Sequence, residues 1–234
     1  GLMRAILAAL DAHREDPQVR VALFTGSGAS FCAGADLQWM RRALELSYAE
    51  TLEDSDLLAE LFLAIYELPL PTIALVNGPA IGGGLGFVAA CDVVIAAEEA
   101  FFRLSEVRLG LIPACISPYL LRKVGESRCR ELMLSGRKLS AREALEIGLV
   151  HRVVPRAALE EAAGEYIRHF LGAGPQALRW CKEVIARGGS PREARAYTVE
   201  IIARLRKGPE GQEGMSAFLE KRRPAWRPPE LDQP

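Results

Sequence analysis

One glycine-rich segment constrains the fold of this chain more than any other feature. Residues 77–92, NGPAIGGGLGFVAACD, stand between two apolar runs, TIALV and VVIAA, which predict buried strands. Three glycines, Gly82, Gly83 and Gly84, occupy the place where the connecting helix is expected to begin. Each glycine in a helix costs about 0.5–1 kcal/mol relative to alanine. Either close backbone packing or a chemical need for bare N–H groups would offset this cost.

Strands and helices alternate along most of the chain. Short β-rich runs predict strands within residues 19–28, 72–76, 92–104 and 149–154. Helical spacing predicts helices at the start of the chain, from Leu37, over 51–68 with a Thr-x-x-Asp start, and near 118–124, 128–134 and 141–147. Beyond Pro155 we expect four amphipathic helices and an extended proline-rich tail. This order predicts an α/β core at residues 1–167 and a C-terminal helical region at residues 168–234.

Composition excludes several functional classes. The 29 Lys and Arg balance 30 Asp and Glu, so the net charge of −1 offers no basic field for nucleic acid. The five scattered cysteines have no CxxC pair, which argues against zinc, any other metal or a disulfide framework and favours a reduced, cytoplasmic setting. No apolar run approaches the ~20 residues of a membrane span, so no membrane partner is expected. The chain opens inside a helix without signal-peptide features, and we expect further sequence upstream.

The usual nucleotide-binding and nucleophile motifs are incomplete. Gly26 and Gly28 follow a strand, but Phe31 replaces the third glycine of a dinucleotide fingerprint. The chain has neither a P-loop nor a G-x-S-x-G nucleophile elbow. The remaining candidates are interpreted as ordinary surface or packing residues: His13, His151, His169, Cys32 and Cys115.

A loop of small residues, FCAGADL at 31–37, follows the first predicted strand as the glycine helix follows the next. Two N–H groups, one from a loop and one from a helix start, can converge as an oxyanion hole, where the helix dipole adds partial positive charge. Removing one such donor typically costs about 2.7–4 kcal/mol of transition-state stabilisation. Composition alone supports this interpretation and close helix–sheet packing equally well.

A proton-transfer group is also needed, and Glu106 in FFRLSEVRLGLIP is the best-placed carboxylate. It is surrounded by apolar residues, and burial would raise its pKa toward neutrality, as suits a general acid or base. Arg103 and Arg108 are close in sequence, so a surface ion pair is the competing interpretation.

Four motifs together resemble the enoyl-CoA hydratase/isomerase (crotonase) superfamily. They are FCAGADL, PTIALVNGPAIGGGLGFVAACDVVIAAEEAFF, SEVRLGLIP and GRKLSAREALEIGLVHRVVP, they occur in family order, and the likeness covers nearly the whole chain. The resemblance implies an α/β fold, a crotonase-like spiral of ββα units with a C-terminal helical region that builds homotrimers, often paired into hexamers. It also implies an acyl-CoA substrate, with coenzyme A as part of that substrate and no separate cofactor.

By position, the resemblance assigns the two N–H donors to Ala35 and Gly83 and the proton transfer to Glu106. The substrate-binding residues that it implies are Ala33, Ala35, Asp36, Leu37, Gly82 and Gly83. Trp39 and Met40 are candidates for the acyl pocket or for core packing.

Two departures from the family pattern stand out. The family's hydratases usually carry a second glutamate, two residues after the triple glycine, and this chain has Gly86 there. An ordered water or a group on the substrate would then replace that acid. The chain also begins after the family's two opening strands and their CoA-contacting loop.

We therefore expect hydration of a 2-enoyl-CoA through a stabilised enolate. The single-glutamate form looks most like bacterial methylglutaconyl-CoA hydratases, whose substrates carry a distal carboxylate that Arg103 or Arg108 would bind. One alternative is a Δ3,Δ2-enoyl-CoA isomerase. The other is a non-catalytic acyl-CoA- or RNA-binding protein on the same fold.

Overall fold

The computed structural model describes residues 1–232 and divides the chain into two compact units. The first comprises residues 1–16, 22–68 and 72–163, and the second comprises residues 17–21, 69–71 and those from 164 onward. The predicted boundary between residues 167 and 168 falls inside α7 (Leu159–Gly172), near this division, and stays a prediction. The last two residues of the predicted C-terminal region, 233 and 234, lie outside the described residues.

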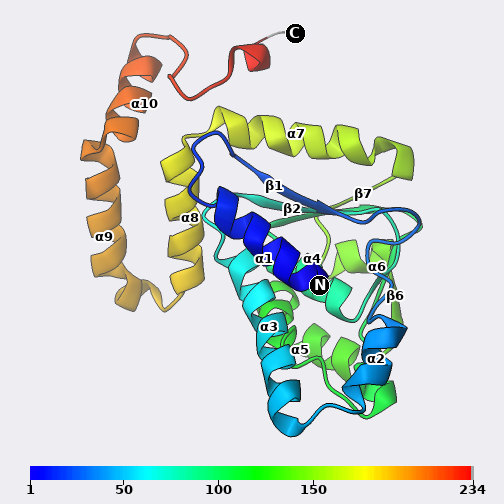
Figure 1. The fold of residues 1–234 in the computed structure, drawn as a ribbon. Helices are drawn as coiled ribbons and strands as arrows, with labels where there is room; N and C mark the ends of the chain where they lie inside the picture. Colours follow the sequence, from blue (N-terminus) through cyan, green and yellow to red (C-terminus); the bar gives the residue numbers. More distant parts are fainter. Residues whose placement is uncertain (233–234) are drawn as a thin grey trace. The chain divides into compact units, whose positions relative to one another are not determined.

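The first unit is built on a four-stranded parallel sheet with the order β1-β2-β4-β7 (Figure 1). The strands are β1 (Ala22–Thr25), β2 (Thr72–Val76), β4 (Val93–Ala97) and β7 (Arg152–Val154). Every residue of β2 is buried, as its continuous apolar run predicts for a central parallel strand. All four strands coincide with predicted runs. Because parallel strands begin at the same edge, the loop after β1 and the loop after β2 emerge side by side.

A second, three-stranded sheet has the order β3-β5-β6, with β3 (Ala80–Ile81), β5 (Phe101–Arg103) and β6 (Lys138–Ser140). The sequence predicted only β5 of these. Strands of two or three residues carry too little periodicity to be recognised, and both missed strands stand directly before helices. β3 is nevertheless the strand that immediately precedes the glycine helix α4.

The helices of the first unit largely follow the predicted positions. They are α1 (Leu2–His13), α2 (Leu37–Ala43), α3 (Tyr48–Tyr66), α4 (Gly83–Ala90), α5 (Ser117–Ser135) and α6 (Ala141–Glu146), with the 3₁₀ segments η1 (Glu106–Leu109) and η2 (Arg156–Ala158). Figure 1 shows α1 beside α3, and the two helices are in contact.

One helix boundary needs correction, and one pair of predicted helices is joined into a single kinked element. α3 begins at Tyr48 rather than Thr51, because Ser47 and Glu50 form a reciprocal capping box ahead of the predicted start. The two helices predicted near 118–124 and 128–134 are confirmed as the two helical segments of α5, which are separated by a kink at Gly125, whose φ of 75° lies in the left-handed region.

The far end of α4 is held by a lysine from α5. The Lys123 ammonium donates to the carbonyl of Val88 at 3.0 Å and to that of Cys91. A cation at the carbonyl end of a helix satisfies orphan acceptors and complements the dipole. Gly125 bends the same element two residues later. The lysine contacts and this bend lie where α5 packs against α4.

One histidine has a more specific place than predicted. His151 is exposed, as expected of a surface residue, yet its Nδ1 accepts the Val94 N–H at 3.0 Å. Its own backbone N–H donates to the Val94 carbonyl at 2.9 Å. The residue therefore extends the pairing between β4 and the segment leading into β7.

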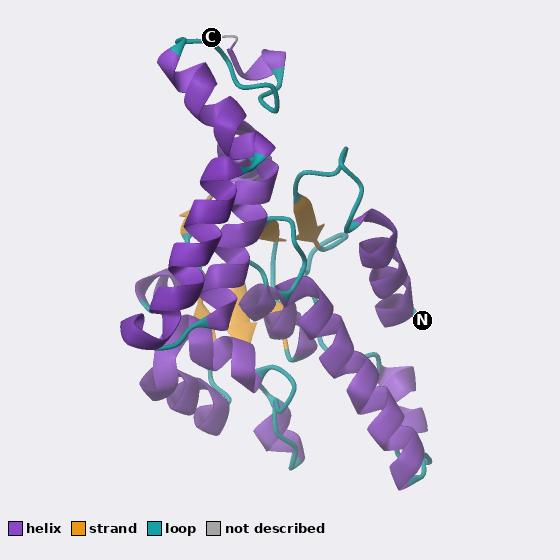
Figure 2. Ribbon diagram, turned by 90° about the vertical axis from the view of Figure 1, so that its left-hand side faces the viewer, coloured by secondary structure: helices purple, strands orange, loops and turns teal. Residues whose placement is uncertain are grey.

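The second unit is helical, with the end of α7, then α8 (Pro175–Arg187), α9 (Pro191–Lys207) and α10 (Pro209–Leu219), followed by η3 (Pro229–Asp232). Figure 2 shows α8 and α9 side by side. The prediction of an extended tail is wrong, because the Trp226 indole donates to the Gly172 carbonyl at 3.3 Å. The segment around Trp226 therefore folds back onto the end of α7. Arg20 stabilises this contact by donating to the carbonyls of Trp226 and Ala173.

Within residues 1–232, the helices are all too short or too polar to cross a membrane. All five cysteines are free thiols.

Candidate active site

The small-residue loop after β1 lies against β3. The Cys32 N–H donates to the Pro79 carbonyl at 3.0 Å, and the Ile81 N–H donates to the Cys32 carbonyl at 2.9 Å. A parallel bridge between Cys32 and Ala80 results. A Cβ at Gly34 would lie 3.6 Å from the Ile81 side chain. The structure therefore brings the loop that carries Ala35 to the strand that enters the glycine helix.

The three glycines of the run have different physical causes. Gly82 has a φ of 55°, which side chains rarely tolerate, and its N–H donates to the Arg103 carbonyl at 2.9 Å. A Cβ at Gly84 would lie only 2.6 Å from the Cys32 Cβ, so close packing accounts for that glycine. A Cβ at Gly83 would meet nothing within 4 Å, and packing does not account for it.

Gly83 is the first residue of α4, where an N–H has no acceptor inside the helix. Neither the Gly83 N–H nor the Ala35 N–H donates a hydrogen bond to any of residues 1–232. Ala35 is exposed and Gly83 is partly exposed. Two unengaged donors, one on the loop and one at the positive end of a helix dipole, are what an oxyanion site requires.

Glu106 begins η1 and turns its carboxylate toward the glycine run. Its Oε1 lies 3.3 Å from the point where a Cβ on Gly82 would stand, so this glycine also leaves room for the carboxylate. Its Oε2 is buried and has no hydrogen-bond partner among the described residues. Burial raises the pKa of Glu106, and its own backbone N–H opposes the rise only in part.

The competing interpretation, a surface ion pair at Glu106, is wrong. The part of the chain that the structure describes contains no ion pair to this carboxylate. Arg103 instead donates through Nε to the Gly136 carbonyl at 3.0 Å, and the Arg108 guanidinium lies beside the same glycine. Both arginines are directed to the turn after α5, which leaves Glu106 without a neutralising cation.

The residues predicted along the CoA path lie at the surface around the loop. Ala33, Asp36 and Leu37 are exposed, and the Leu37 side chain is 73% exposed. The Asp36 carboxylate accepts the N–H groups of Gln38 at 2.7 Å and Trp39 at 3.0 Å, which confirms it as the cap of α2 and lowers its pKa. Contact of these residues with CoA stays a prediction.

The secondary candidates Cys32, Cys115 and Trp39 have separate surroundings. Cys32 fills the space that Gly84 leaves open. Burial raises the pKa of the Cys115 thiol, which disfavours the thiolate that a nucleophile needs. Trp39, 36% exposed, donates from its indole to Asp54 at 3.4 Å and so links α2 to α3.

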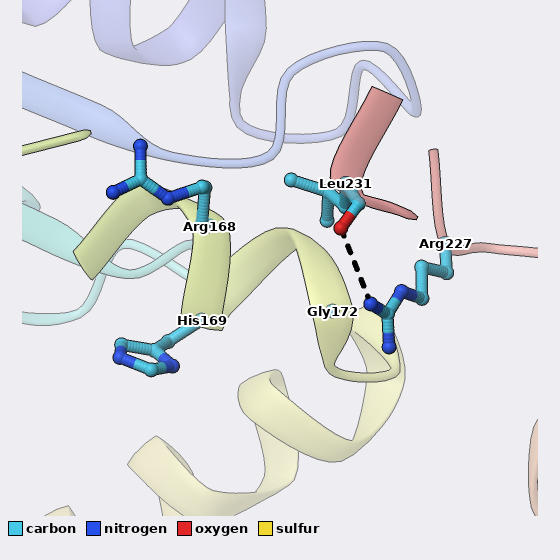
Figure 3. A pocket seen from close by; sticks show the side chains of 5 residues that line it. All are labelled: Arg168, His169, Gly172, Arg227 and Leu231. Atoms are coloured by element: carbon cyan, nitrogen blue, oxygen red, sulfur yellow. Dashed lines mark hydrogen bonds between the residues drawn. The ribbon is translucent and has the colours of Figure 1, made fainter. Parts of the chain in front are cut away.

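A cavity of about 240 Å³ lies elsewhere, in the second unit. Figure 3 shows Arg168 and His169 pointing away from each other, with Arg227 on the far side, where it donates to the Leu231 carbonyl at 3.4 Å. The remaining lining residue is Gly172. None of the predicted site residues lines this cavity, and its basic groups do not converge on one point.

Comparison with known proteins identifies the family. The family described as enoyl-CoA hydratase/isomerase matches residues 1–229. A putative enoyl-CoA hydratase of Thermus thermophilus is 38% identical over 224 residues, covering 95% of this chain and 88% of the relative. The 2,3-dehydroadipyl-CoA hydratase of Escherichia coli is 36% identical over 235 residues, covering 97% and 88%. A crystal structure of an enoyl-CoA hydratase from Shewanella pealeana has a TM-score of 0.92 at 39% identity, covering 96% of this chain and 85% of that one.

The chain belongs to the enoyl-CoA hydratase/isomerase family. The family predicted from the four motifs is confirmed, as is the α/β fold with C-terminal helices. The roles of Ala35, Gly83 and Glu106 stay predictions that the geometry supports.

The raised pKa of Glu106 predicts a pH-dependent effect on stability. The folded state holds this proton more tightly than the unfolded chain, in which a glutamate titrates near pH ~4.3. Stability is therefore highest below the unfolded pKa and falls as pH rises through the folded pKa, where the buried carboxylate must ionise. Glu106→Gln cannot ionise, so its melting temperature should exceed that of the wild type near pH ~8 and approach it near pH ~4.

Glu126→Gln is the matched control, because that side chain is 68% exposed in a pair with Arg130. It should show no gain at high pH. A Glu106→Gln variant that is equally or less stable than wild type at high pH would contradict the burial of an ionisable carboxylate.

Proposed function

We propose that this protein hydrates a 2-enoyl-CoA thioester. One observation carries the proposal: an unpaired, partly buried carboxylate, Glu106, lies against the first turn of a helix whose Gly83 N–H is unengaged. The family membership and the hydratases among the similar proteins support the same reaction.

The chemistry follows from where charge develops. Water adds its oxygen to C3 of the enoyl group and a proton reaches C2, so negative charge passes through the thioester oxygen as an enolate. The N–H groups of Ala35 and Gly83 would meet that oxygen, and the dipole of α4 would add to their field. Glu106 would move the proton, and a raised pKa suits a group that must exist in both forms near neutral pH.

A methylglutaconyl-like thioester is the specific substrate that we infer. Its distal carboxylate needs a cation near the reacting carbons. Arg103 donates to the Gly136 carbonyl. Arg108 also lies beside Gly136, but it is exposed on η1, two residues after Glu106, and would turn toward the substrate to make this contact. Arg108 is therefore the better candidate for this contact. A relative named for 2,3-dehydroadipyl-CoA offers a second dicarboxylic acyl group to assay.

The direct test is loss of the conjugated-thioester absorbance when the purified protein meets a panel of 2-enoyl-CoA substrates. Because a positioned acid or base contributes about 10²–10⁴-fold, Glu106→Gln should lower kcat/KM by that factor. Glu126→Gln should match the wild type. Full activity in Glu106→Gln would remove Glu106 from the mechanism.

Isomerisation is the second candidate, because one carboxylate can take a proton from one carbon and return it to another. A relative from Mycosarcoma maydis is named enoyl-CoA isomerase/hydratase. With a 3-enoyl-CoA, the conjugated absorbance would appear instead of disappearing. The named enzymes among the relatives and the balanced charge do not favour the non-catalytic or RNA-binding alternative.

A pair of variants at one position tests the oxyanion donor. Gly83 is the first helical residue, where proline fits the backbone but removes the N–H. Gly83→Ala keeps the N–H, and a Cβ there has free space. Gly83→Pro should therefore be about 10²–10³-fold slower than Gly83→Ala in kcat, with similar melting temperatures. Equal rates in the two variants would exclude this N–H as a donor.

The homotrimeric or hexameric assembly and the cytoplasmic setting also belong to this proposal. In the second unit, six apolar side chains on α8 to α10 are 44–83% exposed: Ile185, Val199, Ile202, Met215, Phe218 and Leu219. Exposed apolar residues on these helices support a contact with another chain. Light scattering should give a molar mass of three or six chains, and a monomer would contradict the assembly.

A further inference from the structure

A phenylalanine occupies the space above the second turn of the glycine helix. A Cβ placed on Gly86 would lie 2.2 Å from Phe62 Cζ and 2.4 Å from Cε1, well inside van der Waals contact. Phe62 comes from the C-terminal part of α3 and is fully buried. Gly86 is buried as well. The ring therefore rests directly on the backbone of α4 where any other residue would project its side chain.

This ring lies on the helix face that carries the candidate donor. Gly83 and Gly86 are three residues apart, and residues with that spacing share one face of a helix. A side chain at position 86 would project one turn from the Gly83 N–H and toward the same side. Phe62 therefore fills the side-chain space at position 86, one turn along α4 from the proposed oxyanion donor.

The ring packs against other aromatic side chains. The Phe62 ring contacts Phe87 at 5.8 Å and Tyr119 at 6.3 Å between centroids, in edge-to-face geometry, and Tyr119 contacts Tyr66 at 5.4 Å. A water in place of the missing acid would need two to four polar partners, which a close-packed benzyl ring does not offer. The space at position 86 is thus filled, and it is filled by an apolar group.

We propose that Phe62 is the positioning residue that restricts this active site to one carboxylate. It prevents any side chain at position 86 and keeps water from standing in for one, so Glu106 moves protons alone. The inference rests on the proposed hydration for its catalytic part. Its packing part stands independently, because it concerns only the contact between Phe62 and Gly86.

The packing part is tested by thermal unfolding of single and double variants. Gly86→Ala should lower the melting temperature because its methyl group collides with the ring, and Phe62→Ala should lower it by leaving a cavity. Phe62→Ala with Gly86→Ala should be more stable than the sum of the two losses predicts. Leu61→Ala with Gly86→Ala is the matched control, since Leu61 is also buried on α3 and is not among the nearest atoms to that methyl position. Additive losses in the Phe62 pair would overturn the proposal.

The catalytic part is tested by placing an acid in the vacated space. Phe62→Ala with Gly86→Glu should add a second ionisation to the pH profile of kcat/KM for hydration, because two nearby carboxylates shift each other's pKa. Phe62→Ala with Gly86→Gln has the same size but should keep the single ionisation of the wild type. Identical profiles in the two double variants would overturn the catalytic part. Absence of hydration in the wild type would instead overturn the proposed function, and the unfolding measurements would still decide the packing part.

Discussion

The site depends on one close approach between two backbones. The loop after β1 pairs through Cys32 with β3 and lies against the first turn of α4, so closely that position 84 has no room for a Cβ. This contact places the Ala35 loop beside the Gly83 helix start. The sheet sets up the meeting, because β1 and β2 are parallel neighbours and their following segments leave the same edge. A side chain at Gly84 would push apart the two segments that carry the donors.

The cost of the helix glycines is offset by several different contacts. A Cβ would collide with Cys32 at Gly84 and with Phe62 at Gly86, and close packing explains both. A Cβ at Gly83 would have free space and an alanine there would keep the unengaged N–H, so neither packing nor that donor accounts for a glycine at this position. Packing therefore accounts for Gly84 and Gly86, and the use of the Gly83 N–H as an oxyanion donor stays a prediction.

Much of the fold could be predicted from local patterns, and the site only in part. The run TIALV predicted β2, and Asp36 predicted the start of α2, because burial and capping act through adjacent residues. The Ser47 capping box was missed in favour of Thr51, since both residues fit the same short pattern. Two properties of the site depend on contacts distant in sequence: the unpaired state of Glu106, whose neighbouring arginines turn to Gly136, and the ring of Phe62 over Gly86. No single-sequence pattern encodes such contacts.

Glu106 is a partly buried carboxylate with no ion pair among the described residues, and we propose two backbone donors for the thioester oxygen. A saturated acyl-CoA with a ¹³C-labelled thioester carbonyl reports on those donors without turnover. Difference infrared spectroscopy should show the carbonyl stretch at lower frequency when this ligand binds the wild type, because hydrogen bonds weaken the C=O bond. Gly83→Pro should bind with a smaller shift than Gly83→Ala. An unshifted carbonyl in the wild type, or equal shifts in the two variants, would contradict the claim that the helix start of α4 polarises the substrate.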